Sequence, residues 1–236
     1  MNFKWSSFVK NRFDRTVFTG LPLTIFILVL LILLGTLVGI TDAIVNSAPI
    51  VKTDLAFANF LYAHRTPTMA RALYIITNFA DQLTIILLGA GALAYFYFKK
   101  EIAYLYSLVL VFAGSEISAY LLKISVGRAR PLAQIAYYVE DANRSFPSGH
   151  ATSAMAIYGF LTYYLVRHTK FKYKNMVAVI GVLLIGLIGF SRLYLGVHFL
   201  SDVVAGFLMG GLWLVIGMIF RERHFYVAGL KKGVSS

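Results

Sequence analysis

The chain has no cysteine among its 236 residues, and charged residues are scarce. The lack of cysteine excludes disulfide bonds, thiolate metal sites, iron–sulfur clusters and a cysteine nucleophile. Charged residues make up 14% of the chain and hydrophobic residues 59%, whereas an average soluble domain carries about 25% charged residues. This balance argues against a soluble globular protein and against disorder. Acidic residues are fewer than basic ones: the chain has 10 Asp and Glu and 22 Lys and Arg. In so apolar a chain, the resulting net charge of +12 indicates anionic lipid or membrane topology rather than nucleic acid.

Several long apolar runs dominate the sequence. A membrane-spanning helix needs about 20 mostly apolar residues. The first run is longer than the apolar region of a signal peptide, which is about 7–15 residues, so we expect it to be retained. We predict an all-α membrane protein with a single domain over residues 1–236 and six transmembrane helices, at approximately 21–40, 83–98, 102–122, 151–166, 177–194 and 203–220.

Residues 41–82, between the first two predicted spans, have a mixed composition. Charges lie there among apolar residues that recur at helical spacing in two sets, which Pro67 separates. The pattern predicts two short amphipathic helices in the membrane interface, with a simple covering loop as the alternative. The two apolar sets are Leu55, Phe57, Phe60 and Leu61, then Met69, Leu73, Ile76 and Phe79.

The cations are unevenly divided between the two sides of the predicted membrane domain. With six spans, the N-terminus, the 99–101 turn, the 167–176 loop and the C-terminal tail share one side. That side carries 14 of the 22 Lys and Arg residues. The denser side is cytoplasmic by the positive-inside rule. This predicts a multi-pass protein of the cell membrane, with both termini in the cytoplasm.

Three polar motifs fall on the opposite, extracytoplasmic side. Charged residues are costly at membrane depth and tend to be functional when they persist there. Ordinary interfacial anchoring explains any one of these motifs taken singly. It does not explain why all three fall on the same side. They are Lys123-x6-Arg130-Pro131 at the end of the third span, Pro147-Ser148-Gly149-His150 at the start of the fourth, and Ser191-Arg192-x5-His198-x3-Asp202 between the fifth and sixth.

The residue types in these motifs suit phosphate chemistry. Arg matches phosphate oxygens with two parallel hydrogen bonds, and Lys adds a point charge. Ser148 and Gly149 come just before an apolar helical run, where free N–H groups and the helix dipole favour an anion. His198 and Asp202 are four residues apart, so on a helix Asp202 would hold one imidazole nitrogen and leave the other free to attack. His150 would then supply the proton for the leaving oxygen.

Together the three motifs resemble the type-2 phosphatidic acid phosphatase superfamily, which includes integral-membrane lipid phosphatases. The family pattern is met without a substitution between residues 123 and 202, while the N-terminal third of the chain matches only by hydropathy. The resemblance implies hydrolysis without a metal or other cofactor, through a phosphohistidine on His198. It further implies that His150 is the acid, that Asp202 orients His198, and that the phosphate is bound by Lys123, Arg130, Ser148, Gly149 and Arg192.

The expected function is hydrolysis of a lipid phosphate or diphosphate at the outer leaflet. At that depth a head group can reach the motifs while its acyl chains stay in hydrocarbon. Undecaprenyl diphosphate and phosphatidylglycerol phosphate are equal candidates, followed by phosphatidic acid. The alternatives are a lipid A phosphatase, a lipid phosphotransferase and a transporter of a phosphate-bearing solute. The expected partners are the lipid substrate and membrane lipids, with no nucleic acid, and the oligomeric state is open.

Other polar residues have weaker cases. Glu116 lies two turns before Lys123, where we expect a structural ion pair or a water contact. Arg128 adds charge beside the site but lies outside the family pattern. The loop residues Tyr137, Tyr138 and Val139 are placed to contact lipid, and an interfacial aromatic belt explains them equally well.

Overall fold

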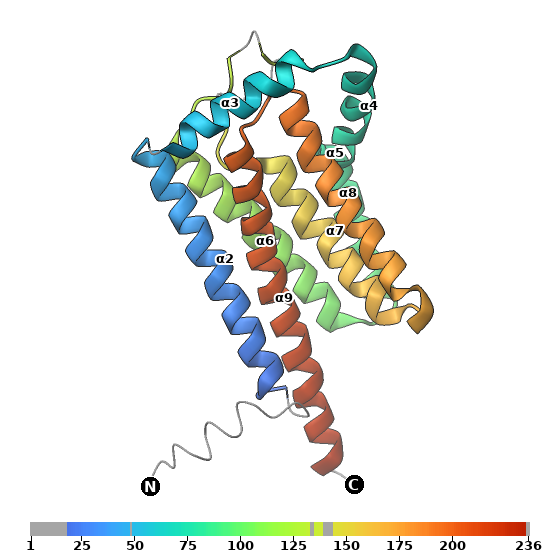
Figure 1. The fold of residues 1–236 in the computed structure, drawn as a ribbon. Helices are drawn as coiled ribbons and strands as arrows, with labels where there is room; N and C mark the ends of the chain where they lie inside the picture. Colours follow the sequence, from blue (N-terminus) through green and yellow to red (C-terminus); the bar gives the residue numbers. More distant parts are fainter. Residues whose placement is uncertain (1–17, 48, 133–134, 139–143, 235–236) are drawn as a thin grey trace, which may run out of the picture.

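The computed structural model describes residues 18–47, 49–132, 135–138 and 144–234, and this part of the chain is all-helical. The long helices run up and down side by side, and α3 and α4 lie at one end of the bundle (Figure 1). The basic N-terminal stretch before residue 18 and Val139 lie outside the described residues. The helices are α2 (Leu21–Val45), α3 (Pro49–Ala63), α4 (Pro67–Thr77), α5 (Gln82–Phe98), α6 (Ile102–Val126), α7 (Gly149–His168), α8 (Lys174–Tyr194) and α9 (Leu200–Val234), with short 3-10 turns at η1 (Asn78–Ala80) and η2 (Phe171–Tyr173).

The six-span prediction is met only in part. Within the described ranges, four helical segments are long and apolar enough to cross a membrane, and the number rises to five if the pair Pro67–Ala80 and Gln82–Phe98, bent by 42°, counts as one span. The four segments are α2, α6, α8 with η2, and α9. The predicted fourth span, α7, is not among them. Nine of its 20 residues are buried, against two of 25 in α2, so α7 faces protein and needs less apolar surface.

The two short helices predicted between the first spans are confirmed as α3 and α4, and most of their large apolar side chains are not buried in the protein. Pro67 opens α4, and the Thr66 side chain caps it by accepting a hydrogen bond from the Met69 N–H at 3.4 Å. Only Leu61 and Leu73 of the predicted apolar sets are fully buried. Large apolar side chains of an amphipathic membrane helix turn toward lipid, which leaves the smaller or polar residues facing protein. The buried residues are Asp54, Ala58 and Leu61 in α3, and Ala70, Leu73 and Thr77 in α4.

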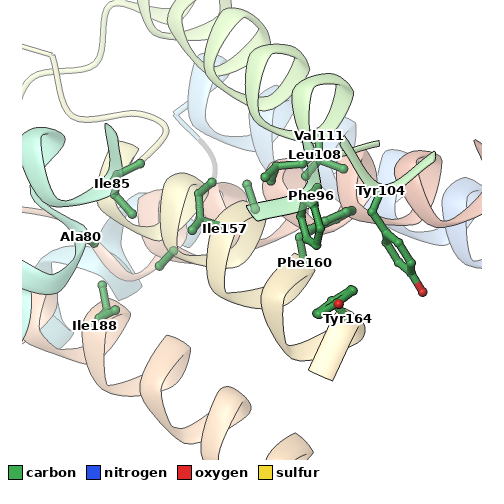
Figure 2. Packing of buried hydrophobic residues seen from close by; sticks show 12 residues of the cluster. Ala80, Ile85, Phe96, Tyr104, Leu108, Val111, Ile157, Phe160, Tyr164 and Ile188 are labelled. Carbon is green, nitrogen blue, oxygen red and sulfur yellow. The ribbon is translucent and has the colours of Figure 1, made fainter. Parts of the chain in front are cut away.

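An aromatic cluster fastens α5, α6 and α7 together at the end of the bundle away from α3. Phe96 stacks on Tyr104 with ring centroids 5.7 Å apart, and its edge meets Tyr164 at 4.9 Å (Figure 2). Phe160 joins the same cluster. Offset and edge-on aromatic pairs add about 0.5–1.5 kcal/mol each beyond their buried area. The three helices are therefore tied at this end, opposite to the end where the motifs lie.

Close packing of α7 against α9 brings two of the motifs together. A methyl group at Gly206 would lie 2.6 Å from the Ser148 carbonyl oxygen, and one at Gly210 would lie 2.6 Å from that of Thr152. The Ser148 N–H also donates to the Asp202 carbonyl oxygen at 3.0 Å. Glycine is needed wherever two backbones approach this closely. The beginning of α7 therefore lies against the beginning of α9.

Candidate active site

All eight predicted site residues are described, and all lie at the end of the bundle that α3 and α4 cover (Figure 1). They come from helix ends and from the segments that connect the helices. Lys123 is in the last turn of α6, and Arg130 follows it in the connecting segment. The others are Ser148, Gly149 and His150 at the start of α7, Arg192 at the end of α8, His198 in the turn before α9, and Asp202 in the first turn of α9.

His198 is held between Asp202 and Arg130. Its Nδ1 lies 3.4 Å from the Asp202 carboxylate, and its Nε2 lies 3.2 Å from Nη1 of Arg130. A guanidinium can only donate, so Nε2 is the acceptor and Nδ1 carries the hydrogen that faces Asp202. Asp202 in turn accepts the Phe199 N–H at 2.9 Å. The predicted pairing of His198 with Asp202 is therefore present, although His198 lies in the turn before α9 and not on the helix itself.

Burial and positive charge lower the pKa of His198. The side chain is almost wholly enclosed, and burial alone disfavours the charged imidazolium. The charges of Arg192, Arg130 and Lys123 act in the same direction, and together these effects hold the pKa well below its ordinary value. The imidazole is therefore neutral at physiological pH, which leaves its lone pair available.

A cavity of about 590 Å³ opens between α5, α6 and α7, and the histidine that lines it is His150. Lys123, Gly149 and His150 line it, and a methyl group at Gly149 would meet no protein atom within 4 Å. Glu116 also lines the cavity and accepts a hydrogen bond from Ser153 at 2.6 Å. This hydrogen bond to a hydroxyl group of α7 is a different interaction from the ion pair or water contact that was expected.

The beginning of α7 presents an anion-binding geometry. Ser148 is the N-cap residue and Gly149 the first residue of the helix. The Ser148 hydroxyl is buried, and within the described residues it has no hydrogen-bond partner. A buried hydroxyl without a partner costs free energy, and free N–H groups at a helix N-terminus favour negative charge. The arrangement suits a phosphate oxygen at this position.

Arg192 is fully buried and is fixed by residues that the sequence patterns did not assign. Its Nη1 donates to the Thr77 hydroxyl at 2.9 Å and to the hydroxyl of Tyr138. Thr77 is on the buried face of α4, and Tyr138 is one of the loop aromatics expected to contact lipid. Tyr138 therefore has a defined partner inside the protein, in addition to any part in an aromatic belt.

Two further charged residues join the site, Asp54 of α3 and Arg128 of the segment after α6. Arg128 donates to Asp202 at 2.7 Å through Nη1 and to Asp54 at 2.7 Å through Nη2. The sequence carries one signal for Asp54, because it stands four and seven residues before Ala58 and Leu61, on one face of a helix. Buried carboxylates are rare unless they are paired.

The described residues contain no group of three or more His, Asp or Glu side chains able to hold a metal ion. Positive charge at the site comes instead from Lys123, Arg130 and Arg192. Metal-independent catalysis stays a prediction that chelation can test.

Comparison with known proteins identifies the family. The model of the PAP2 superfamily matches residues 102–226, which include all three motifs. The chain belongs to the PAP2 superfamily. This PAP2 protein is 33% identical over 190 residues to Phosphatidylglycerophosphatase B of Bacillus subtilis (strain 168), covering 78% of the chain and 91% of that relative. It is also 33% identical over 129 residues to Lipid A 1-phosphatase of Rhizobium etli, covering 51% and 50% of the two chains.

A solved structure agrees with the fold of this PAP2 protein. The crystal structure of the first transmembrane PAP2 type phosphatidylglycerolphosphate phosphatase from Bacillus subtilis superposes with a TM-score of 0.72 at 30% identity, covering 82% of this chain and 96% of that one. The protein is accordingly a multi-pass PAP2-type membrane lipid phosphatase. This confirms the family that the motifs indicated.

Proposed function

We propose that this PAP2 protein is a phosphatidylglycerol phosphate phosphatase, which releases the terminal phosphate to give phosphatidylglycerol and inorganic phosphate. The observation that carries the proposal is the 33% identity to Phosphatidylglycerophosphatase B over 91% of that relative's length. The sequence alone left undecaprenyl diphosphate an equal candidate, and this similarity favours the phosphomonoester. The expected position of the site is the extracytoplasmic face, because the opposite side holds most of the cations.

The chemistry would run through a phosphohistidine on His198. The phosphate would be held by Lys123, Arg130, Ser148, Gly149 and Arg192. As the substrate enters, Arg130 would break its hydrogen bond to Nε2 of His198 and donate to a phosphate oxygen instead. The Nε2 lone pair then forms a bond to phosphorus while the bond to the lipid oxygen breaks, and His150 gives that oxygen a proton. In the second step His150 takes a proton from water, whose oxygen displaces Nε2 and releases phosphate.

The cavities support a lipid as substrate. A second cavity, of about 270 Å³, lies between α5, α6 and α7, and only apolar residues line it. Ile86 and Phe112 line both this cavity and the polar one that holds Lys123 and His150. A head group beside Lys123 would thus have an apolar slot next to it for the start of an acyl chain. A water-soluble phosphate ester would gain nothing from that slot.

The test is phosphate release by the purified protein in detergent from four lipids: phosphatidylglycerol phosphate, phosphatidic acid, undecaprenyl diphosphate and lipid A 1-phosphate. We expect the highest kcat/KM with phosphatidylglycerol phosphate, no release by the His198→Ala variant, and full activity after chelation with EDTA. Acid-labile, base-stable phosphate trapped on the wild-type protein supports the phosphohistidine. Faster release from another lipid would reassign the substrate, and wild-type turnover by the alanine variant would remove His198 as nucleophile.

A further inference from the structure

Asp54 is a buried carboxylate outside the three motifs. Its side chain is 2% exposed, and it lies on the face of α3 that packs against the bundle. Taking a carboxylate out of water costs several kcal/mol unless it is paired and hydrogen-bonded. The partners of Asp54 therefore indicate what holds it there.

Those partners are Arg128 and Ser201. Oδ2 of Asp54 accepts from Nη2 of Arg128 at 2.7 Å and from the hydroxyl of Ser201, while Oδ1 accepts the Ser201 N–H at 3.0 Å. The other terminal nitrogen of Arg128, Nη1, donates to the Asp202 carboxylate and to the Ser201 hydroxyl, each at 2.7 Å. One guanidinium thus joins two buried carboxylates, one from α3 and one from α9.

The guanidinium of Arg128 is held at both terminal nitrogens and covered on one face. Its guanidinium carbon lies 4.4 Å from the centroid of the Phe199 ring, so the plane of the group is covered by an aromatic face. Two carboxylates hold its ends, and a bidentate arrangement of this kind leaves a guanidinium little freedom. Arg128 therefore holds the carboxylate of Asp202 in one place, and that carboxylate faces Nδ1 of His198.

We propose that Asp54 and Arg128 are positioning residues for phosphoryl transfer, which hold the Asp202 carboxylate against the imidazole of His198. The inference rests on the proposed role of His198 as nucleophile. When Nε2 bonds to phosphorus, the imidazole gains positive charge, and a fixed carboxylate at Nδ1 stabilises that charge. Arg128 alone would cancel the charge of Asp202. Asp54 restores it, because two carboxylates and one guanidinium leave a net charge of −1 beside the ring.

The surroundings of His198 make this net charge important. Lys123, Arg130 and Arg192 all act on the ring with positive charge, and they oppose formation of the cationic phosphohistidine. The cluster of Asp54, Arg128 and Asp202 supplies negative charge that opposes these cations. Removing Asp54 should therefore slow the chemical step while leaving the phosphate-binding cations in place.

The experiment measures kcat and KM for phosphatidylglycerol phosphate with purified variants. We expect Asp54→Asn and Arg128→Ala each to lower kcat at least tenfold with KM within twofold of the wild type. Because Asp54 acts through Arg128, the double variant should be no slower than Arg128→Ala alone. The control is Asp42→Asn, an exposed carboxylate of α2 that accepts a hydrogen bond only from Asn46 within the described residues, and it should match the wild type.

Each contrary outcome has its own meaning. A wild-type kcat in Asp54→Asn would overturn the inference. So would an equal loss of kcat from Asp54→Asn in the wild-type and Arg128→Ala backgrounds, since Asp54 would then only dock α3 onto α9. If Asp54→Asn does not yield folded protein, Arg128→Lys, which leaves the bonds of Asp54 to Ser201 in place, must show the same loss of kcat. No release by the wild type would instead overturn the proposed function and, with it, this inference.

Discussion

Burial and nearby cations together decide the protonation state of His198. Burial is the largest cause of its lowered pKa, and the charge of Arg192 is the next. A lowered pKa means that the neutral form persists as the pH falls through the ordinary range. A neutral ring can attack phosphorus, whereas an imidazolium cannot.

We therefore expect His198 to stay neutral from pH 8 down to pH 6.5, where a histidine of ordinary pKa, about 6.5, is half protonated. The measurement is NMR of the protein with isotope-labelled histidine, in which the signal missing from His198→Ala is assigned to His198. Free histidine in the same sample reports the ordinary titration. A His198 signal that follows the free histidine would show that the cations do not act on the ring as the geometry indicates.

Gly149 leaves open space in front of the first turn of α7. Because a methyl group there would meet no protein atom within 4 Å, we expect Gly149→Ala to fold normally and to raise KM for the lipid phosphate about tenfold, a loss of about 1.4 kcal/mol. The matched control is Gly186→Ala in α8, which also has open space but lines neither cavity. An unchanged KM in Gly149→Ala would mean that phosphate does not approach this backbone.

At the scale of the helices, the site depends on how the beginning of α7 meets the beginning of α9. Gly206 allows the contact, since its α-carbon faces the Ser148 carbonyl oxygen. We expect Gly206→Ala to lower the midpoint of thermal unfolding by several degrees and kcat at least tenfold, because overpacking costs about 1–3 kcal/mol. Gly211→Ala, in the same helix but with its nearest neighbours at 3.8 and 4.0 Å, is the control. Equal behaviour of the two variants would contradict this view of the contact.

The elements also explain which features the sequence could predict. The motif residues lie at helix ends, where a short spacing fixes a geometry, so the pairing of His198 with Asp202 could be inferred from a separation of four. Pro67 marked the start of α4 for a similar local reason. Asp54 meets Ser201 across 147 residues of chain, and no local pattern reports such a contact. The apolar spacing predicted α3 and α4 as amphipathic helices, but it could not tell which residues of each helix face the protein, because the larger apolar side chains point away from it.

For the molecule as a whole, alternation of the helices puts the three motifs at one end and the 167–176 loop at the other (Figure 1). If the positive-inside rule holds, a cysteine at position 144 should react with an impermeant maleimide in intact cells, and one at position 172 only after lysis. Both native side chains, Arg144 and Lys172, are exposed, and the chain has no cysteine of its own to interfere. The reverse pattern would place the substrate in the cytoplasmic leaflet.

The enclosure of α7 has a consequence for how the protein is made. The helix that carries Ser148, Gly149 and His150 is not among the segments apolar enough to cross a membrane by themselves. As the chain leaves the ribosome, α7 therefore has little tendency to leave the translocon for lipid until α6 and α8 are there to cover it. We expect chains truncated after residue 172 to leave α7 outside the bilayer, and chains that continue through α8 to insert both helices as a hairpin. A glycosylation tag at the truncated end distinguishes the two. Ser148, Gly149 and His150 would thus reach their final positions only after α8 has been made, and α9, which carries Asp202, follows later still, so only a nearly complete protein could acquire activity.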